Sequence, residues 1–293
     1  MVPAAVESKL ALAAQTEVES VLASGGPHTS KPIGEVSAVR TMTLDGFDAI
    51  ANAWSPIMRS YGYRTSLQAV FCHSRPQVTF KRVPSPHAPL PPASGRGRCE
   101  LADLLVVIDH TDPSTSVKDR RAVLIQAKLL HSGSIKPARK EWIQHELLAW
   151  RPGFDFVDSC YTKKTRDLDA SPVVGNPANT AEYGGIDLRV TPPVWNQWLT
   201  SQVAPCFTSQ ADFGPFLAGM VVGRLQYGRE AIDGGVDDWS LTVDELLRVT
   251  GANPIVQRAS KVLRGTSHVV GFIIDTAPHT PWWRGELRST GGV

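Results

Sequence analysis

The chain has 293 residues, of which 42% are hydrophobic and 20% are charged, proportions that are typical of a folded globular protein. Its formal net charge of +2 excludes the strong overall positive field of a protein that coats nucleic acid, so any contact with a polyanion must come from local basic patches. The four cysteines form no CxxC pair, which leaves neither a zinc-ligand spacing nor a small disulfide framework.

The N-terminal third of the sequence predicts two helices followed by two strands. Strong helix formers with spaced Leu and Val predict a helix over residues 4–23, and the pattern at 44–59 predicts a second one. Short apolar stretches at 67–73 and 77–83 are typical of strands. The next segment, 84–98, contains five prolines, which favours a loop or flap.

The two clearest strands follow this loop. They are predicted at "ELADLLVVID" (100–109) and "RAVLIQAKLL" (121–130), and a polar stretch between them must turn the chain. A helix with one broad apolar face is predicted at about 138–150, directly after the second strand. The stretch 154–161 predicts a further strand.

The remaining sequence predicts mostly helices. Residues 163–190 are rich in Gly, Pro and Asn and indicate irregular structure. Helices are predicted at about 194–203, 211–226 and 239–249, before a last strand at 268–275.

The sequence carries no visible sorting signal. The N-terminus lacks a basic segment followed by an apolar run, and no stretch approaches the roughly 18 uninterrupted apolar residues of a membrane span. We therefore expect a cytoplasmic protein with no membrane partner.

Two polar side chains interrupt the second clear strand. Gln126 and Lys128 are two positions apart, so in a strand they point to the same face. Asp103 lies at the head of the apolar part of the preceding strand, and pairing of the two strands can bring its carboxylate beside them. The sequence therefore predicts a cluster of one acid, one amide and one amine.

This set of side chains suits phosphodiester hydrolysis. Carboxylate and amide oxygens are hard ligands that can hold Mg²⁺ together with phosphate oxygens and water. A bound metal lowers the pKa of a water ligand and neutralises charge that develops on phosphorus oxygens. A neighbouring lysine can position or deprotonate that water.

The stretch "ELADLLVVI" followed by "AVLIQAKL" resembles the PD-(D/E)xK nuclease superfamily in its Asp…Gln-x-Lys variant. The resemblance covers about residues 40–165. It implies an α/β fold with a mixed sheet and a restriction-endonuclease-like core, a metal site for Mg²⁺ or Mn²⁺ at Asp103 and Gln126, and a catalytic set completed by Lys128.

This sequence departs from the family pattern at two points. No proline precedes Asp103, and the neutral Gln126 replaces the usual acid, which weakens metal binding unless another carboxylate assists. Glu100 is the preferred candidate, because an irregular strand start could turn it inward. Asp48 and Glu35 are the alternatives.

Local basic clusters are the candidates for contacts with a phosphate backbone. Lys136, Arg139 and Lys140 lie between the second strand and the helix after it, and we rank this patch first. Arg96 and Arg98, just before Asp103, are second.

We therefore expect a nuclease-like core at 41–165, an N-terminal helix and loop at 1–40, and a mostly helical extension packed on the core at 166–293. The resemblance implies a metal-dependent endodeoxyribonuclease that acts in defence against foreign DNA or in genome maintenance. These residues do not distinguish DNA from RNA, and a homodimer or an activating protein partner fits equally well. The alternative is a non-catalytic module that keeps the nuclease fold and binds nucleic acid or protein.

Overall fold

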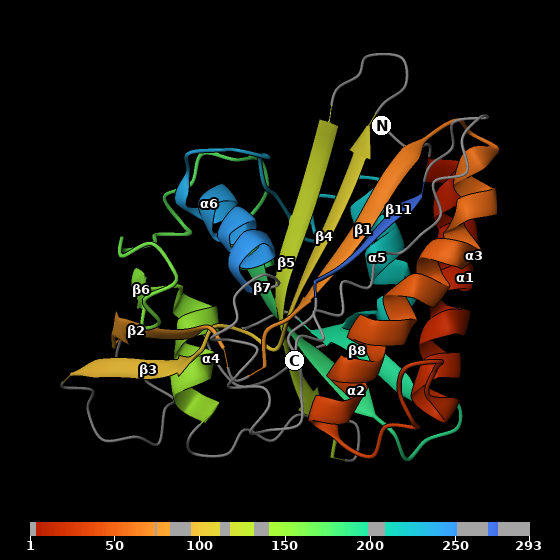
Figure 1. Cartoon of the computed structure of the whole chain (residues 1–293), viewed down its shortest axis with the longest axis horizontal. Coiled ribbons are helices and arrows are strands. Elements are labelled where there is room, and N and C mark those ends of the chain that lie inside the picture. Colours follow the sequence, from red (N-terminus) through yellow and green to blue (C-terminus); the bar gives the residue numbers. More distant parts are fainter. Residues whose placement is uncertain are drawn as a thin grey trace, which may run out of the picture.

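The structure is a computed structural model that describes residues 4–73, 75–82, 95–111, 118–131, 141–198, 209–250 and 269–274. Helices cover both faces of one large sheet, and a second, smaller sheet lies at one side (Figure 1). None of the described helices is long and apolar enough to cross a membrane.

The large sheet has eight strands. They are β1 (Arg64–Phe71), β4 (Leu104–Thr111), β5 (Lys118–Leu129), β7 (Ala181–Asp187), β8 (Val194–Trp198), β9 (Ser209–Asp212), β10 (Arg229–Glu230) and β11 (Val269–Ile274). Their order is β11–β1–β4–β5–β7–β8–β9, and β10 pairs with β5 beside this path. Only β5 and β7 are parallel among the described pairs. The predicted α/β fold with a mixed sheet is confirmed.

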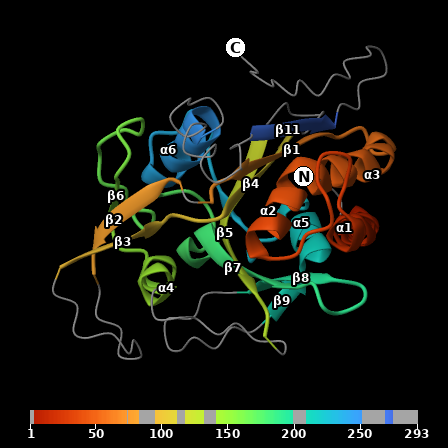
Figure 2. The ribbon, with the colours of Figure 1, turned by 60° about the horizontal axis from the view of Figure 1, so that its bottom comes forward.

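One face of this sheet is covered by helices from the N-terminal part of the chain and by one helix from its C-terminal half. They are α1 (Ala4–Ser24), α2 (Glu35–Thr41), the π-helical η1 (Met42–Gly46), α3 (Phe47–Arg59) and α5 (Phe213–Val221). Figure 2 shows α1, α2, α3 and α5 together on this side. Their apolar side chains form one core with Leu104, Val106 and Ile125 of the sheet.

The opposite face carries the small sheet, two further α-helices and two short helical segments. These elements are β2 (Gln77–Lys81), β3 (Arg96–Glu100), β6 (Phe154–Phe156), α4 (Glu141–Trp150), the 3-10 turn η2 (Pro177–Thr180), α6 (Asp238–Glu245) and the π-helical η3 (Leu246–Thr250). The small sheet has the order β3–β2–β6. A second core forms here, with Leu105, Val107 and Leu124 pointing into it. Strands β4 and β5 are therefore covered on both faces, which explains their nearly continuous apolar sequence.

The predictions for the N-terminal half need two corrections. The helix predicted at 44–59 belongs to a continuous helical stretch that begins at Glu35, where Ser37 Oγ accepts the N–H groups of Ile33 and Gly34. The strand predicted at 100–109 is interrupted, because β3 ends at Glu100 and β4 begins at Leu104. The chain passes from the small sheet to the large sheet between these two residues.

Beyond residue 166 the prediction of mostly helical structure is wrong, because this part contributes five strands, β7 to β11, among the described residues. The segment predicted as irregular contains β7, which is buried along its whole length next to β5. The helix predicted at 194–203 is wrong for its first half, which forms β8. Residues 41–165 and 166–293 therefore share one sheet.

Candidate active site

Backbone pairing brings Asp103 next to Gln126. Asp103 lies in the bend before β4, where its N–H donates to the carbonyl of Ile125 at 3.0 Å and its carbonyl accepts the N–H of Cys72 at 2.8 Å. The Asp103 Oδ2 atom accepts hydrogen bonds from Gln126 Nε2 and from the N–H of Ala127, the latter at 2.9 Å. Asp103 and Gln126 are each only 1% exposed, so this contact is shielded from water.

Lys128 lies one pleat further along the same face of β5 and is 9% exposed. Its Nζ donates to Glu35 Oε1 at 3.3 Å, while Glu35 Oε2 accepts the N–H of Leu129 at 3.4 Å. Glu35 lies in the first turn of α2, so the early start of this helix places the carboxylate over β5. Burial raises the pKa of Glu35, and the charge of Lys128 partly opposes this shift.

Glu100 and His73 complete the cluster around the other oxygen of Asp103. His73 Nδ1 donates to Asp103 Oδ1 at 2.9 Å and lies 3.7 Å from Glu100 Oε2. In an unbroken strand Glu100 would face away from Asp103, but the bend between β3 and β4 turns both side chains to the same place. The hydrogen bond to Asp103 raises the pKa of His73, burial opposes this shift, and Asp103, Glu100 and Glu35 add to it by their charge.

These three side chains could hold a divalent metal ion. One ligand atom from each of His73, Glu100 and Asp103 lies within 4.8 Å of the others. Two carboxylate oxygens and an imidazole nitrogen suit Mn²⁺, Fe²⁺ or Zn²⁺ as well as Mg²⁺, because imidazole is a good ligand for transition metals. A bound ion would replace the proton that His73 Nδ1 shares with Asp103.

Sequence reasoning missed His73 because nothing in its immediate neighbourhood marks it. It lies just beyond β1, and only the antiparallel register of β1 and β4, in which Phe71 pairs with Leu104, carries it to Asp103. Asp48, one of the alternatives for the assisting acid, has His28 and Asp45 as its charged neighbours instead.

Helix α4 closes the cluster from the side of the small sheet. Gln144 is buried and its Nε2 donates to Gln126 Oε1. His145 is also buried, where its ring meets Trp142 edge-on and stacks on Tyr183, an arrangement typical of a structural histidine.

The basic residues predicted to contact a phosphate backbone are only partly within the described residues. Arg96 and Arg98 are exposed on the same face of β3 as Glu100. Arg96 Nε donates to Thr79 Oγ1 at 2.7 Å and its guanidinium pairs with Asp155, while Arg98 Nε donates to Gln77 Oε1 at 3.4 Å. The first-ranked patch of Lys136, Arg139 and Lys140 lies outside the described residues.

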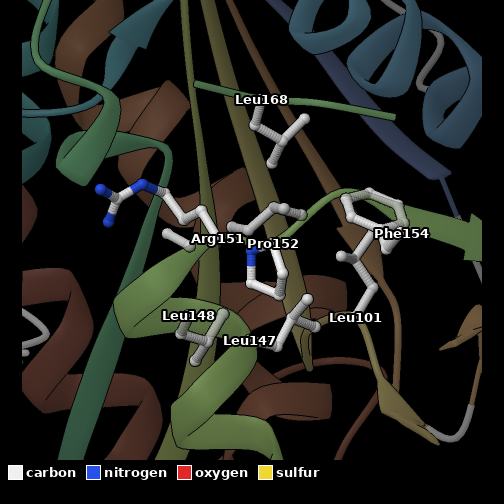
Figure 3. A pocket seen from close by; sticks show the side chains of 9 residues that line it. Leu101, Leu147, Leu148, Arg151, Pro152, Phe154 and Leu168 are labelled. Atoms are coloured by element: carbon white, nitrogen blue, oxygen red, sulfur yellow. The ribbon is translucent and has the colours of Figure 1, made fainter. Parts of the chain in front are cut away.

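An apolar pocket lies near the cluster and contains none of the predicted site residues. Its lining comes from several elements around α4: Leu101, Leu124, Leu147, Leu148, Arg151, Pro152, Phe154, Leu168 and Ala181 (Figure 3). Since it offers a single charged side chain, it has no constellation for acid–base or metal chemistry.

Comparison with known proteins adds nothing to this geometry. No protein-family model, no curated protein and no solved structure matches the chain.

Proposed function

We propose that the protein is a metal-dependent nuclease of the PD-(D/E)xK type that hydrolyses phosphodiester bonds in DNA. The observation that carries this proposal is the convergence of Asp103, Gln126 and Lys128 in one polar cluster that also holds two further carboxylates and a histidine. The cluster lies where the large sheet meets the small one. A restriction-endonuclease-like core would carry its site on a mixed sheet of this kind.

Each residue has a distinct role in the proposed reaction. Asp103, Glu100 and His73 would hold Mn²⁺ or Mg²⁺, which supplies an activated water and neutralises charge on the phosphoryl oxygens. Lys128 would hold the attacking water by its ammonium group and stabilise the negative charge of the pentavalent phosphorus. Glu35, which accepts a hydrogen bond from Lys128, keeps that ammonium group in place.

The substrate would approach over the exposed face of β3. Arg96 and Arg98 share this face with Glu100, so phosphates bound by the arginines would lead towards the metal ligands. The patch of Lys136, Arg139 and Lys140 would extend this contact, a proposal that rests on the sequence alone. By its resemblance the protein would act in defence against foreign DNA or in genome maintenance, as a homodimer or with an activating partner.

A cleavage assay tests the proposal. Supercoiled plasmid is incubated with the protein and Mn²⁺ or Mg²⁺, and we expect nicking or linearisation that EDTA abolishes. Asp103→Ala and Lys128→Ala should each lower the rate by at least about 100-fold, because the first removes a ligand of the metal and the second removes the ammonium group that holds the attacking water. Asp48→Asn serves as a control, since this acid lies away from the cluster.

Two results would reject the proposed site. Cleavage that survives both alanine substitutions would place the chemistry elsewhere, and cleavage that survives EDTA would remove the role of the metal. RNA is offered in parallel, because the cluster itself does not select the sugar.

The alternative function is a non-catalytic binding module. The neutral amide of Gln126, where the superfamily usually has an acid, favours this alternative. It predicts DNA binding that falls with added salt and depends on Arg98, with no cleavage under any metal. DNA binding without cleavage, in the presence of bound Mn²⁺, would support the non-catalytic alternative.

A further inference from the structure

Gln126 makes two hydrogen bonds that fix the direction of its amide. A carboxylate oxygen can only accept, so the Gln126 atom that faces Asp103 Oδ2 must be the donor Nε2. The carbonyl oxygen Oε1 is then turned to the other side, where it accepts Nε2 of Gln144. The three side chains therefore form a row of hydrogen bonds in which Gln144 donates to Gln126 and Gln126 donates to Asp103.

The two carboxylate oxygens of Asp103 therefore have different partners. Oδ2 is held by two protein donors, Gln126 Nε2 and the N–H of Ala127. Oδ1 accepts the hydrogen bond of His73 Nδ1, and the same nitrogen lies 3.7 Å from Glu100 Oε2. The oxygen of Gln126 that could bind a metal lies on the far side of its amide from Asp103.

From this division we infer that Gln126 and Gln144 are positioning residues rather than metal ligands. Together they hold the carboxylate of Asp103 so that Oδ1 joins Glu100 and His73 around the ion. The inference rests on the proposed metal-dependent function and deepens it, because it moves the metal to the side of Asp103 away from Gln126.

The inference also explains why a glutamine occupies the position of an acid. A glutamate there would bring two carboxylates together, and such a pair needs a shared proton or a metal between them. An amide needs neither, and it supplies Oδ2 with a second donor beside the N–H of Ala127. A site with its metal on the Oδ1 side is therefore served better by glutamine than by glutamate.

Binding of Mn²⁺ alone, measured by calorimetry on the full chain without nucleic acid, tests this assignment with two variants. Gln126→Glu and Gln126→Leu should both weaken binding, by about 10- to 100-fold, because each removes the donor that orients Asp103. If Gln126 were a ligand, the two variants would diverge: Glu would tighten binding by adding a charged oxygen, and Leu would weaken it.

Gln68→Glu is the matched control. Gln68 Nε2 also donates to a carboxylate on a neighbouring strand, Asp109 Oδ2 at 2.9 Å, but outside the metal cluster. This variant reports the cost of a new carboxylate pair on folding and should leave Mn²⁺ affinity unchanged. Thermal unfolding of each variant identifies any that does not fold.

A second variant keeps the test decisive if position 126 tolerates no change. Gln144→Leu removes the donor to Gln126 Oε1 and should weaken Mn²⁺ binding several-fold, whereas a ligand oxygen freed from this bond would bind no more weakly.

The possible failures are separable. Mn²⁺ binding by Gln126→Glu or Gln144→Leu that equals or exceeds that of the unaltered protein overturns the positioning role and leaves the metal centre standing. An unaltered protein that binds no Mn²⁺ at millimolar concentration overturns the metal centre and the proposed function together.

Discussion

Glu182 is an acid whose carboxyl group lies in the interior of the fold. It lies in β7, is completely buried, and neither carboxylate oxygen has a hydrogen-bond partner among the described residues. Burial alone raises its pKa well above the ordinary value. The folded protein therefore favours the protonated, neutral form of this side chain.

This shift makes a prediction about stability and pH. Because the folded-state pKa of Glu182 exceeds its unfolded value, its contribution to stability is complete below the unfolded pKa of about 4.3 and is lost as pH rises towards the folded value. Over that window the unfolding free energy falls by up to about 1.4 kcal/mol per pH unit. Glu182→Gln has no proton to lose and should flatten this slope.

Urea unfolding between pH 5 and pH 9 measures the effect. The unaltered protein should lose stability relative to Glu182→Gln as the pH rises, so that the variant is the more stable at high pH. Glu17→Gln, on α1, is the control for removing one carboxylate. Parallel pH profiles for Glu182→Gln and the unaltered protein would contradict the prediction.

At the residue scale, the sequence predicted those site residues that a local sequence pattern can identify. Gln126 and Lys128 stood out because polar residues at alternate positions of an apolar strand must share a face. Glu100 was the preferred assisting acid and does meet the cluster. His73 and the contact of Glu35 with Lys128 depend on register and on where a helix begins, and neither can be read from the neighbouring residues.

The contact between α1 and α5 depends on one glycine. A Cβ atom on Gly214 would lie 2.7 Å from both Ala11 O and Gln15 Cα, atoms of the α1 backbone that cannot rotate away. The N–H of Gly214 also donates to Gln15 Oε1 at 3.1 Å. The two helices can therefore approach closely only if this position has no side chain.

Gly214→Ala should destabilise the fold by pushing α5 away from α1. We expect a loss of about 1–3 kcal/mol in the free energy of unfolding, the usual cost of overpacking a tight contact. Equilibrium unfolding in urea measures it. Gly34→Ala is the control, since a Cβ there meets nothing within 4 Å. Equal stability of the two variants would show that the helices have room to adjust.

Elements were predicted well where residue composition and hydrophobic periodicity indicate the same structure, as for α1, β5 and β11. They were predicted poorly where the two conflict. β7 was missed because "AEYGGID" contains two glycines, which usually indicate a loop. Here Gly184 makes room for Trp195 of β8, whose indole Nε1 would lie 2.6 Å from an added Cβ. β8 was assigned to a helix because its alternation, with Trp195 and Gln197 buried, is too short to separate the two periods.

At the scale of the whole molecule, distant parts of the chain build one sheet. β11, from residues 269–274, pairs with β1, and β7 inserts beside β5. The sequence suggested consecutive units because local patterns carry no information about long-range pairing. The segment 41–165 thus shares its sheet with strands from the C-terminal half, and the N-terminal α1 packs on α5 from that same half.

This arrangement predicts how the protein responds to truncation. β11 covers one edge of β1 along six paired residues, from Thr65 to Val70, and also contacts α3. A chain that ends after Thr250 loses this strand and leaves the backbone groups of β1 unpaired along that edge. Exposed edges of this kind associate with one another. We expect a lower unfolding temperature and concentration-dependent association in gel filtration.

A chain that ends after Thr276 is the matched control, because it keeps β11 and removes only the residues after it. It should melt and elute like the full chain if β11 is the stabilising part of the C-terminal segment. If both truncated chains behave alike, whether stable or unstable, the pairing of β11 with β1 is not what closes the sheet. Since β1 leads directly to His73, the proposed metal site depends on this edge, and the 250-residue chain should also bind Mn²⁺ more weakly than the full chain.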